Sequence, residues 1–256
     1  MRELIIDNFV INDESKCFVI AEVGHNHQGS VDTAKQIFVK AKEAGADAVK
    51  LQKRNNKHLF TKEMYDSHYD NRNAYGDTYG AHRDALEFGL EEYVELQQYA
   101  NELGLIFFAT PFDLPSVDFL EKLNVPMYKI ASGDLKSTPL LKYVAQTGKP
   151  VLVSTGGGEM DDVQRAYDVI TAENPNIAIL QCTAAYPCEP EEMNLNVITT
   201  FREKFPDKVI GLSDHQSGIS MALVAYTLGA RIVEKHFTMN RAWRGTDHAF
   251  SLEPVG

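Results

Sequence analysis

Short apolar runs rich in β-branched residues alternate along the chain with longer segments whose apolar side chains recur every three or four positions. Runs of this length predict buried strands, and the periodic segments between them predict helices. Several of the helical segments end at a glycine, such as Gly45, Gly104, Gly148 and Gly229, as helices commonly do. The predicted strands cover residues 18–23, 47–51, 105–109, 127–131, 151–154, 177–182, 209–212 and 231–237.

Eight alternating strand–helix units predict a parallel sheet with right-handed crossovers that closes into a (β/α)8 TIM barrel. The chain has 256 residues, close to the ~250 that is usual for such a barrel. An open doubly wound sheet is the alternative, which eight strands and the lack of a Gly-x-Gly-x-x-Gly sequence disfavour. Residues 4–11 predict a small hairpin at the bottom of the barrel. We therefore expect an N-terminal hairpin over residues 1–17 and a catalytic barrel over residues 18–256.

A formal net charge of −11 argues against nucleic acid or an anionic membrane as a partner, because binding to phosphate backbones requires a basic surface. No apolar run approaches the ~20 residues of a membrane span, and the first residues lack the apolar segment of a signal peptide. The three cysteines, Cys17, Cys182 and Cys188, form no Cys-x-x-Cys pair, which fits free thiols in a reducing compartment. The composition therefore predicts a cytoplasmic protein.

The segment after the second predicted strand, residues 53–89, is unusually long, and loops of that length are typically functional or disordered. Its mixture of Arg, Asn, Tyr and Gly is compatible with a lid over a polar substrate or with a solvated loop. Near the other end of the chain, Ser251-Leu252-Glu253-Pro254 resembles the cap of an eighth helix. We expect the barrel to be truncated before that helix.

Two histidines occupy matching places on consecutive strand–helix units, His215 in Gly-Leu-Ser-Asp-His and His236 in Val-Glu-Lys-His-Phe. Each follows a predicted strand, at the end of the barrel where active sites are built. A single histidine there is usually a satisfied polar residue, but neighbouring strands lie only about 5 Å apart, so two imidazoles can share one ion. Two nitrogens with oxygens from water or substrate suit a divalent ion such as Mn²⁺, Co²⁺, Fe²⁺ or Zn²⁺.

Charged side chains also follow the first two strands. Glu22 lies at the top of the first, and Lys50 and Gln52 share the inward parity of the second. A lysine inside a barrel needs a partner, because an unpaired buried charge is costly. The sequence leaves two interpretations open: a structural ion pair between Glu22 and Lys50, or a lysine that binds an anionic ligand.

Hydroxyl groups, glycines and a second lysine follow the next strands: Thr110, then Lys129, Ser132 and Asp134, then Ser154 in Ser-Thr-Gly-Gly-Gly. Hydroxyls beside glycines allow backbone amides to approach an oxyanion, and lysines supply the charge. The pattern resembles a phosphate cradle but is not a P-loop. Tyr186 and Asp247 follow later strands and could contact a ligand. Each also has a purely structural interpretation: Tyr186 as a packing residue of the rim, and Asp247 as half of a surface ion pair.

Several motifs occur in a fixed order: Ile-Ala-Glu-Val-Gly-x-Asn-His-x-Gly, Val-Lys-Leu-Gln, Thr-Pro-Phe-Asp, Tyr-Lys-Ile-Ala-Ser-Gly-Asp, Ser-Thr-Gly, Gln-Cys-Thr-x-x-Tyr-Pro, Gly-Leu-Ser-Asp-His, Glu-Lys-His-Phe-Thr and Ser-Leu-Glu-Pro. Together they closely resemble the catalytic barrel of the N-acetylneuraminate (sialic acid) synthase family. The resemblance spans residues 18–254. The segment Tyr-Gly-Asp-Thr-Tyr-Gly-Ala-His also looks like the branch that includes the animal enzymes, some of which use the 6-phosphorylated sugar.

The resemblance implies condensation of phosphoenolpyruvate with the open-chain aldehyde of N-acetylmannosamine, its 6-phosphate or a related acetamido-hexose, with release of phosphate by C–O cleavage. It implies Mn²⁺, with Mg²⁺ or Co²⁺ as alternatives, held by His215 and His236. Glu22 would activate the water that adds at C2, and Asp134 would move protons at the sugar, although the family often has Glu there. The phosphoenolpyruvate-binding residues would be Lys50, Thr110, Lys129, Ser132, Ser154 and Ser213, and the sugar-binding residues Gln52, Asn73, Tyr186 and Asp247.

Family members normally carry an eighth helix, a linker and a small antifreeze-like domain that completes the sugar site of the other subunit of a homodimer. This sequence resembles the barrel without that domain. Two other functions remain open: a non-catalytic paralogue that binds metal or phosphoenolpyruvate, and a metal-dependent pyruvate aldolase. Phosphate release separates them, because only the synthase consumes phosphoenolpyruvate and frees phosphate.

Overall fold

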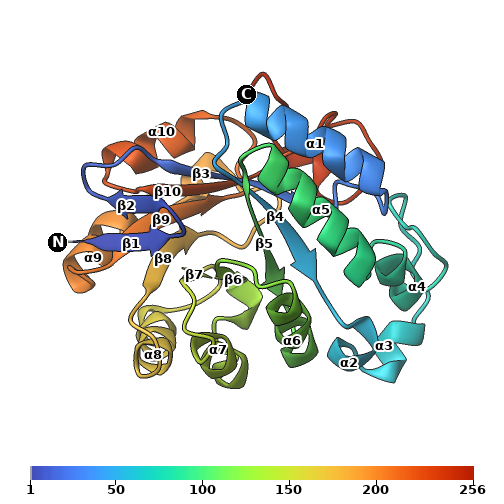
Figure 1. Cartoon of the computed structure of the whole chain (residues 1–256), viewed down its shortest axis with the longest axis horizontal. Coiled ribbons are helices and arrows are strands. Elements are labelled where there is room, and N and C mark those ends of the chain that lie inside the picture. The colour runs from blue at the N-terminus through green and yellow to red at the C-terminus, as the bar shows by residue number, and fades with distance from the viewer. Residues whose placement is uncertain (1) are drawn as a thin grey trace.

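A computed structural model describes residues 2–256 and forms a closed parallel barrel (Figure 1). All eight predicted strands are present within a few residues of their expected bounds. They are β3 (Phe18–Gly24), β4 (Ala48–Lys53), β5 (Ile106–Pro111), β6 (Tyr128–Ile130), β7 (Val151–Ser154), β8 (Ile177–Cys182), β9 (Val209–Asp214) and β10 (Ile232–His236). The strands pair in chain order, and β10 pairs with β3 to close the barrel. The closed order confirms the TIM barrel and excludes the open doubly wound sheet.

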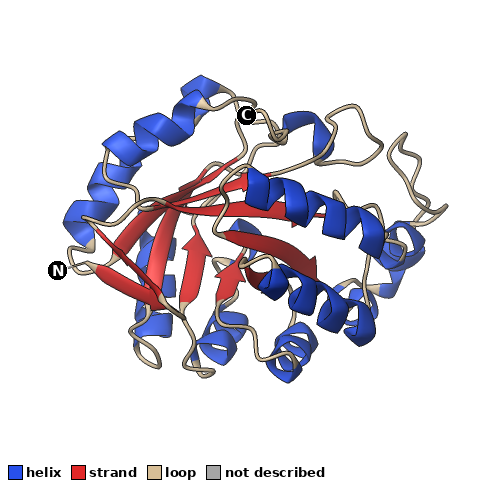
Figure 2. Ribbon diagram, turned by 45° about the horizontal axis from the view of Figure 1, so that its top comes forward, coloured by secondary structure: helices blue, strands red, loops and turns tan. Residues whose placement is uncertain are grey.

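Helices surround the barrel strands (Figure 2). They are α1 (Val31–Glu43), α5 (Leu90–Glu102), α6 (Leu114–Lys122), α7 (Thr138–Ala145), α8 (Met160–Thr171), α9 (Val197–Lys204) and α10 (Ser220–Thr227). Helix α1 illustrates how the sequence sets the bounds: the Ser30 hydroxyl accepts a hydrogen bond from the backbone N–H of Thr33 at 3.2 Å. The helix ends before Gly45, whose φ of +93° favours glycine. Its buried stripe, which includes Ile37 and Phe38, packs into the core.

The N-terminal hairpin covers the amino ends of the barrel strands. Strands β1 (Glu3–Ile6) and β2 (Phe9–Asn12) pair antiparallel, and Leu4, Ile6 and Ile11 join the main hydrophobic core. The ring of Phe9 lies edge-on to that of Phe18 at the start of β3, with centroids 5.4 Å apart. The hairpin thus lies at the bottom of the barrel, as the sequence predicts, and leaves the carboxyl ends of the strands open.

The long segment after β4 differs from the expected irregular loop. It contains three short helices, α2 (Asn56–Leu59), α3 (Lys62–Asp66) and α4 (Tyr79–Asp84). Asn55, Thr61 and Thr78 each cap one of them by accepting a hydrogen bond from a backbone N–H of the first turn. These side chains satisfy amide groups that the helix itself leaves unpaired. The segment is therefore an ordered wall beside the top of the barrel.

Residues 251–254, whose sequence resembles the cap of an eighth helix, form a bend, a bridge and a turn in the structure. The backbone N–H of Leu252 donates to the carbonyl of His236, and that of Thr238 donates to Leu252. These bonds form a parallel bridge between Phe237 and Leu252. The segment after the short 3-10 helix His248–Phe250 is held extended beside the end of β10.

Candidate active site

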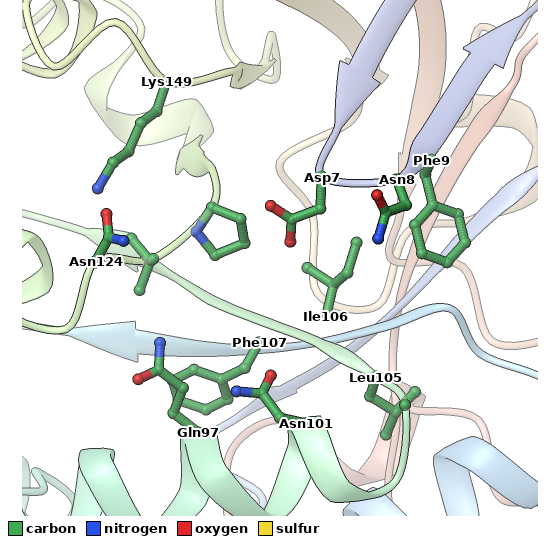
Figure 3. Close-up of a pocket in the computed structure, with 13 residues that line it drawn as sticks. Asp7, Asn8, Phe9, Gln97, Asn101, Leu105, Ile106, Phe107, Asn124 and Lys149 are labelled. Carbon is green, nitrogen blue, oxygen red and sulfur yellow. The ribbon is translucent and has the colours of Figure 1, made fainter.

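A cavity lies at each end of the barrel. The one at the amino ends has a volume of about 550 Å³. Figure 3 shows Asp7 of the hairpin turn and Lys149 at this cavity, with the amide side chains of Asn8, Gln97, Asn101 and Asn124 around it. The polar residues that line it, including Asn101 and Asn124, are exposed or half-buried. Solvated side chains of this kind are ordinary surface and do not form a reactive centre.

The second cavity, of about 440 Å³, lies at the carboxyl ends of the strands. Charged and polar side chains that are almost completely buried line it, and buried ionisable groups in a cleft mark functional sites. Most residues singled out in the sequence meet here: Glu22, Lys50, Gln52, Thr110, Lys129, Ser132, Ser154, Tyr186, Ser213, His215, His236 and Asp247. We take this cavity as the candidate active site.

Two of the predicted residues do not line the cavity. Asn73 lies in the neighbouring loop, where its side-chain oxygen accepts a hydrogen bond from the backbone N–H of Gly245 at 3.3 Å. Asp134 ends the short 3-10 helix Ser132–Asp134, one residue beyond Gly133, which does line the cavity. Burial raises the pKa of Asp134 to about 6. Its carboxyl therefore titrates close to neutral pH, as a group that exchanges protons must.

Both interpretations of Lys50 find support in the geometry. Its ammonium lies 2.6 Å from Glu22 Oε2 and donates to the Thr110 hydroxyl at 2.7 Å. Gln52 donates to the other Glu22 oxygen at 2.7 Å, so Lys50 and Gln52 both face inward as their parity predicts. The ion pair exists, and Lys50 also faces the cavity. A ligand anion therefore meets an ammonium that is already fixed in position.

The sequence analysis missed Glu234, although its parity on β10 matches that of His236. The carboxylate of Glu234 accepts a hydrogen bond from Ser213 at 3.1 Å and lies 3.9 Å from the ammonium groups of both Lys50 and Lys129. These two lysines outweigh the effect of burial and lower the pKa of Glu234. Burial raises the pKa of Glu22, to which the charge of Glu234 also contributes. Two neighbouring carboxyls with pKa values shifted in opposite directions can divide acid and base roles.

Lys129 has no carboxylate as close as the one beside Lys50. It donates to the Ser154 hydroxyl and, at 2.9 Å, to the carbonyl of Ile130. Burial lowers the pKa of Lys129, although Glu234 opposes this effect. Across the adjoining loop, Ser132 Oγ accepts a hydrogen bond from the N–H of Gly156 at 2.9 Å, which fixes this hydroxyl at the cavity. An ammonium beside hydroxyls and glycine amides is a suitable anion site.

The histidine pair lies at the opposite side of the same cavity. The ring centroids of His215 and His236 are 5.5 Å apart, and Tyr186 lies 4.0 Å from the ring of His215. His215 Nδ1 is 2.9 Å from the carbonyl of Thr183, which fixes a proton on Nδ1 and directs Nε2 away from that carbonyl. Burial lowers the pKa of His215, but Cys182 and the Thr183 carbonyl outweigh this effect and raise it. Burial lowers the pKa of His236 to about 4, so this ring is neutral at pH 7.

These features fit a divalent ion on the two histidines. His236 Nδ1 is buried without a hydrogen-bond partner and lies 3.7 Å from Asp247 Oδ2. Neutral imidazoles with one free nitrogen are the form that binds metal, at about 2.1 Å. Within residues 2–256, no three His, Cys, Asp or Glu side chains gather in metal-binding geometry. The remaining ligand positions would therefore belong to water or substrate.

Four further cavity residues were not distinguished in the sequence. Cys182 places its sulfur 3.9 Å from His215 Nδ1. His25, Arg54 and Arg83 form a basic cluster at the rim beside β4. Because side chains alternate between the two faces of a strand, the position of Cys182 on its strand could have predicted that it faces the barrel interior. The rim cluster forms because of the path that the long segment after β4 takes. No periodic pattern of apolar residues predicts that path.

The barrel and this cavity define a class: a TIM-barrel enzyme whose site is suited to a small anionic substrate and carries neighbouring carboxyl groups with opposite pKa shifts. The chain belongs to the NeuB family, whose model matches residues 37–256. It is 43% identical to the N-acetylneuraminate-9-phosphate synthases of Mus musculus and Homo sapiens over 244 residues, which are 95% of this chain and 68% of those proteins. These matches confirm the resemblance stated from the motifs.

Relatives from bacteria agree with this assignment. The chain is 37% identical to N,N'-diacetyllegionaminic acid synthase of Legionella pneumophila, over 93% of the chain and 68% of that protein. Among solved structures, it matches the N-acetylneuraminic acid synthetase of Leptospira borgpetersenii with a TM-score of 0.88 and 31% identity, covering 99% of this chain and 84% of that one. The barrel with its N-terminal hairpin is therefore the fold of these synthases.

Proposed function

We propose that this protein condenses phosphoenolpyruvate with the open-chain form of N-acetylmannosamine or a related acetamido-hexose to give a sialic-acid-type nonulosonate and inorganic phosphate. One observation carries the proposal: two buried lysines and a histidine pair face the same cavity from different strands. The lysines suit a phosphorylated carboxylic acid, and the histidines suit the ion that would activate an aldehyde. The relatives from Mus musculus, Homo sapiens and Legionella pneumophila are named as synthases of such sugars, which supports the same reaction.

In the proposed reaction, C3 of phosphoenolpyruvate forms a bond to the aldehyde carbon, and the aldehyde oxygen takes a proton. Water adds at C2 and gives up a proton, and the C2–O bond to phosphate then breaks. Lys129, Ser132 and Ser154 would hold the phosphate, and Lys50, Thr110 and Ser213 the carboxylate. A divalent ion on His215 and His236, Mn²⁺ or alternatively Mg²⁺ or Co²⁺, would supply Lewis-acid polarisation of the aldehyde.

Glu22 is placed to take the proton of the attacking water. Its two oxygens are held by Lys50 and Gln52 at 2.6 and 2.7 Å, so the carboxyl cannot rotate away from the cavity. Its raised pKa makes it a better proton acceptor than an ordinary carboxylate. Gln52, Tyr186, Asn73 and Asp247 would contact the sugar above it.

The assay that tests this proposal measures phosphate release from phosphoenolpyruvate with a panel of acetamido-hexoses and Mn²⁺. We expect release only when a suitable sugar is present, in a one-to-one ratio with the new keto acid. A pyruvate aldolase would instead make product from pyruvate without releasing phosphate. A non-catalytic paralogue would bind phosphoenolpyruvate and release none.

Asp134 provides a pH test of the same proposal. With a pKa of about 6, its carboxyl is mostly ionised at pH 7 and can accept a proton from a sugar hydroxyl. We therefore expect kcat/KM to fall as pH decreases through about 6, because protonation removes the base. Asp134→Asn should lower kcat by at least about 100-fold and abolish the fall of kcat/KM at acidic pH. Asp134→Glu keeps a carboxyl and should still show such a fall. If kcat/KM of the asparagine variant still falls through the same pH range, another group is responsible for that pH dependence.

The location and assembly of the protein are also part of the proposal. No helix in residues 2–256 has the length and apolar character needed to cross a membrane. All three cysteines are unpaired, which favours a reducing compartment such as the cytoplasm. By resemblance, the protein would be a homodimer that acts on small-molecule substrates. Its net charge of −11 argues against nucleic acid or an anionic membrane as a partner.

A further inference from the structure

A buried ion pair lies on the outer face of the barrel, directly behind the two histidines. The side chains of Lys235 on β10 and Asp214 on β9 are 7% and 0% exposed, and the Lys235 ammonium lies 2.6 Å from Asp214 Oδ2. Side chains alternate between the two faces of a strand, so both point away from the cavity that Glu234 and His236 line. Neither Lys235 nor Asp214 lines that cavity.

The remaining side chains of β9 and β10 on this outer face are apolar and buried: Ile210, Leu212 and Val233. Removing two charges from water costs free energy that their mutual attraction often fails to return, and apolar residues of similar size stabilise a fold as well or better. Stability therefore does not explain the pair. A buried ion pair can instead fix one particular geometry, and this one lies one residue before each histidine of the proposed metal site.

The backbone pairing between β9 and β10 stops before it reaches the histidines. The register of these two strands ends at the pair Asp214–Lys235, and β9 itself ends at Asp214. His236 is still held by β3, because it pairs there with Glu22. His215 lies one residue beyond the last backbone pair that β9 and β10 share, so other contacts must set its distance from His236.

The Lys235 ammonium supplies these contacts. Besides Asp214, it donates to the backbone carbonyl of Gln216, and the backbone N–H of Gln216 donates to Asp214 Oδ1 at 2.8 Å. The two residues that flank His215 in the chain are thus both held by the side chain that directly precedes His236. One ammonium group therefore joins the two segments that carry the proposed metal ligands.

We propose that Lys235 and Asp214 are positioning residues of the metal site, which fix the separation of His215 and His236 from the outside of the barrel. This inference rests on the proposed function, because it concerns the divalent ion assigned to the two histidines. Ligands that are held in place before the ion arrives lose little entropy when it binds. Releasing His215 from this constraint should therefore weaken metal binding without removing either ligand.

The experiment measures Mn²⁺ binding without substrates, by calorimetry and by the electron paramagnetic resonance signal of free Mn²⁺. Lys235→Met should weaken Mn²⁺ binding by about 10- to 100-fold and keep one ion per chain. At saturating Mn²⁺, the KM for phosphoenolpyruvate should change less than about twofold. Lys149→Met is the matched control, because it removes a lysine–carboxylate pair of 2.7 Å at the other end of the barrel, and it should leave Mn²⁺ affinity unchanged.

A second variant separates positioning from stability, because Lys235→Met also leaves Asp214 buried without its partner. The double variant Lys235→Met/Asp214→Leu removes both charges and should restore the melting temperature to within about 4 °C of the wild type. Its Mn²⁺ affinity should remain at least about 10-fold below that of the wild type, since the contacts to Gln216 are still missing. If the affinity returns together with the stability, the pair is only structural and the proposal is wrong.

Phosphate release from phosphoenolpyruvate with acetamido-hexoses distinguishes this inference from the proposed function. If the wild type binds Mn²⁺ but releases no phosphate with any sugar, the proposed function is wrong, and weaker Mn²⁺ binding in the double variant still supports the positioning role. If the wild type turns over and Lys235→Met binds Mn²⁺ as tightly as the wild type does, the function stands and the positioning role is wrong. A wild type that binds no Mn²⁺ overturns both the metal assignment and this inference.

Discussion

Replacing either His215 or His236 with alanine should abolish divalent-ion binding and lower turnover at least about 100-fold, while the barrel remains folded. Each ring supplies one nitrogen, and within residues 2–256 no cluster of three ligand side chains exists to compensate. The core, in contrast, is built from strand interiors and helix faces. Both variants should therefore lose metal binding and keep the thermal stability of the wild type.

Calorimetric titration with Mn²⁺ and a thermal melt of the same samples measure both quantities. His58→Ala is a suitable control, because His58 is an exposed residue of α2 and does not line the cavity. We expect one ion per chain in the wild type and the control, and none in the two active-site variants. Unchanged stoichiometry in either active-site variant would refute the metal assignment.

The two active-site lysines should respond differently to replacement by methionine. Lys129→Met should weaken phosphoenolpyruvate binding by about 10- to 150-fold and cost less stability than Lys50→Met, because its nearest carboxylate, Glu234, is 3.9 Å away and keeps Lys50 at the same distance. Lys50→Met should weaken binding similarly but also destabilise the fold by about 3 kcal/mol, since it leaves Glu22 buried without its partner at 2.6 Å. For a chain of this size, that loss corresponds to a melting temperature lower by about 6 to 12 °C.

Equilibrium binding of phosphoenolpyruvate and urea denaturation of both variants measure this difference. The double variant Lys50→Met/Glu22→Gln should recover part of the lost stability, because it removes the unpaired charge, but not the affinity. If both lysine variants melt like the wild type, the pair with Glu22 is not a structural one. If they lose affinity for the sugar as much as for phosphoenolpyruvate, the lysines are not the anion site.

The sequence predicts the barrel well because each barrel strand is buried on both faces and is therefore a short, mostly apolar run in the sequence. The same regularity places polar residues at the strand ends, so Glu22, Lys50 and His236 can be assigned to one end without coordinates. Glu234 could have been predicted in the same way. Side chains alternate along a strand with a period of two, so Glu234 and His236 lie on the same face of β10.

The rim of the site could not be predicted in this way. Arg54 and Arg83 contact His25 across 29 and 58 positions of the sequence, and that meeting depends on how the segment after β4 folds. The capping residues Asn55, Thr61 and Thr78 are a local signal for its three short helices. Caps can indicate that short helices exist, but the direction in which such a segment packs is set by tertiary contacts.

The central claim is that the C2–O bond of phosphoenolpyruvate breaks during condensation with an acetamido-hexose. Phosphoenolpyruvate labelled with ¹⁸O at the bridging oxygen tests it directly, with mass spectrometry of both products. We predict that the label appears in the released phosphate and that the new nonulosonate carries none from this source. Unlabelled phosphate, with the label kept by pyruvate or by the sugar product, would show P–O cleavage and contradict the account.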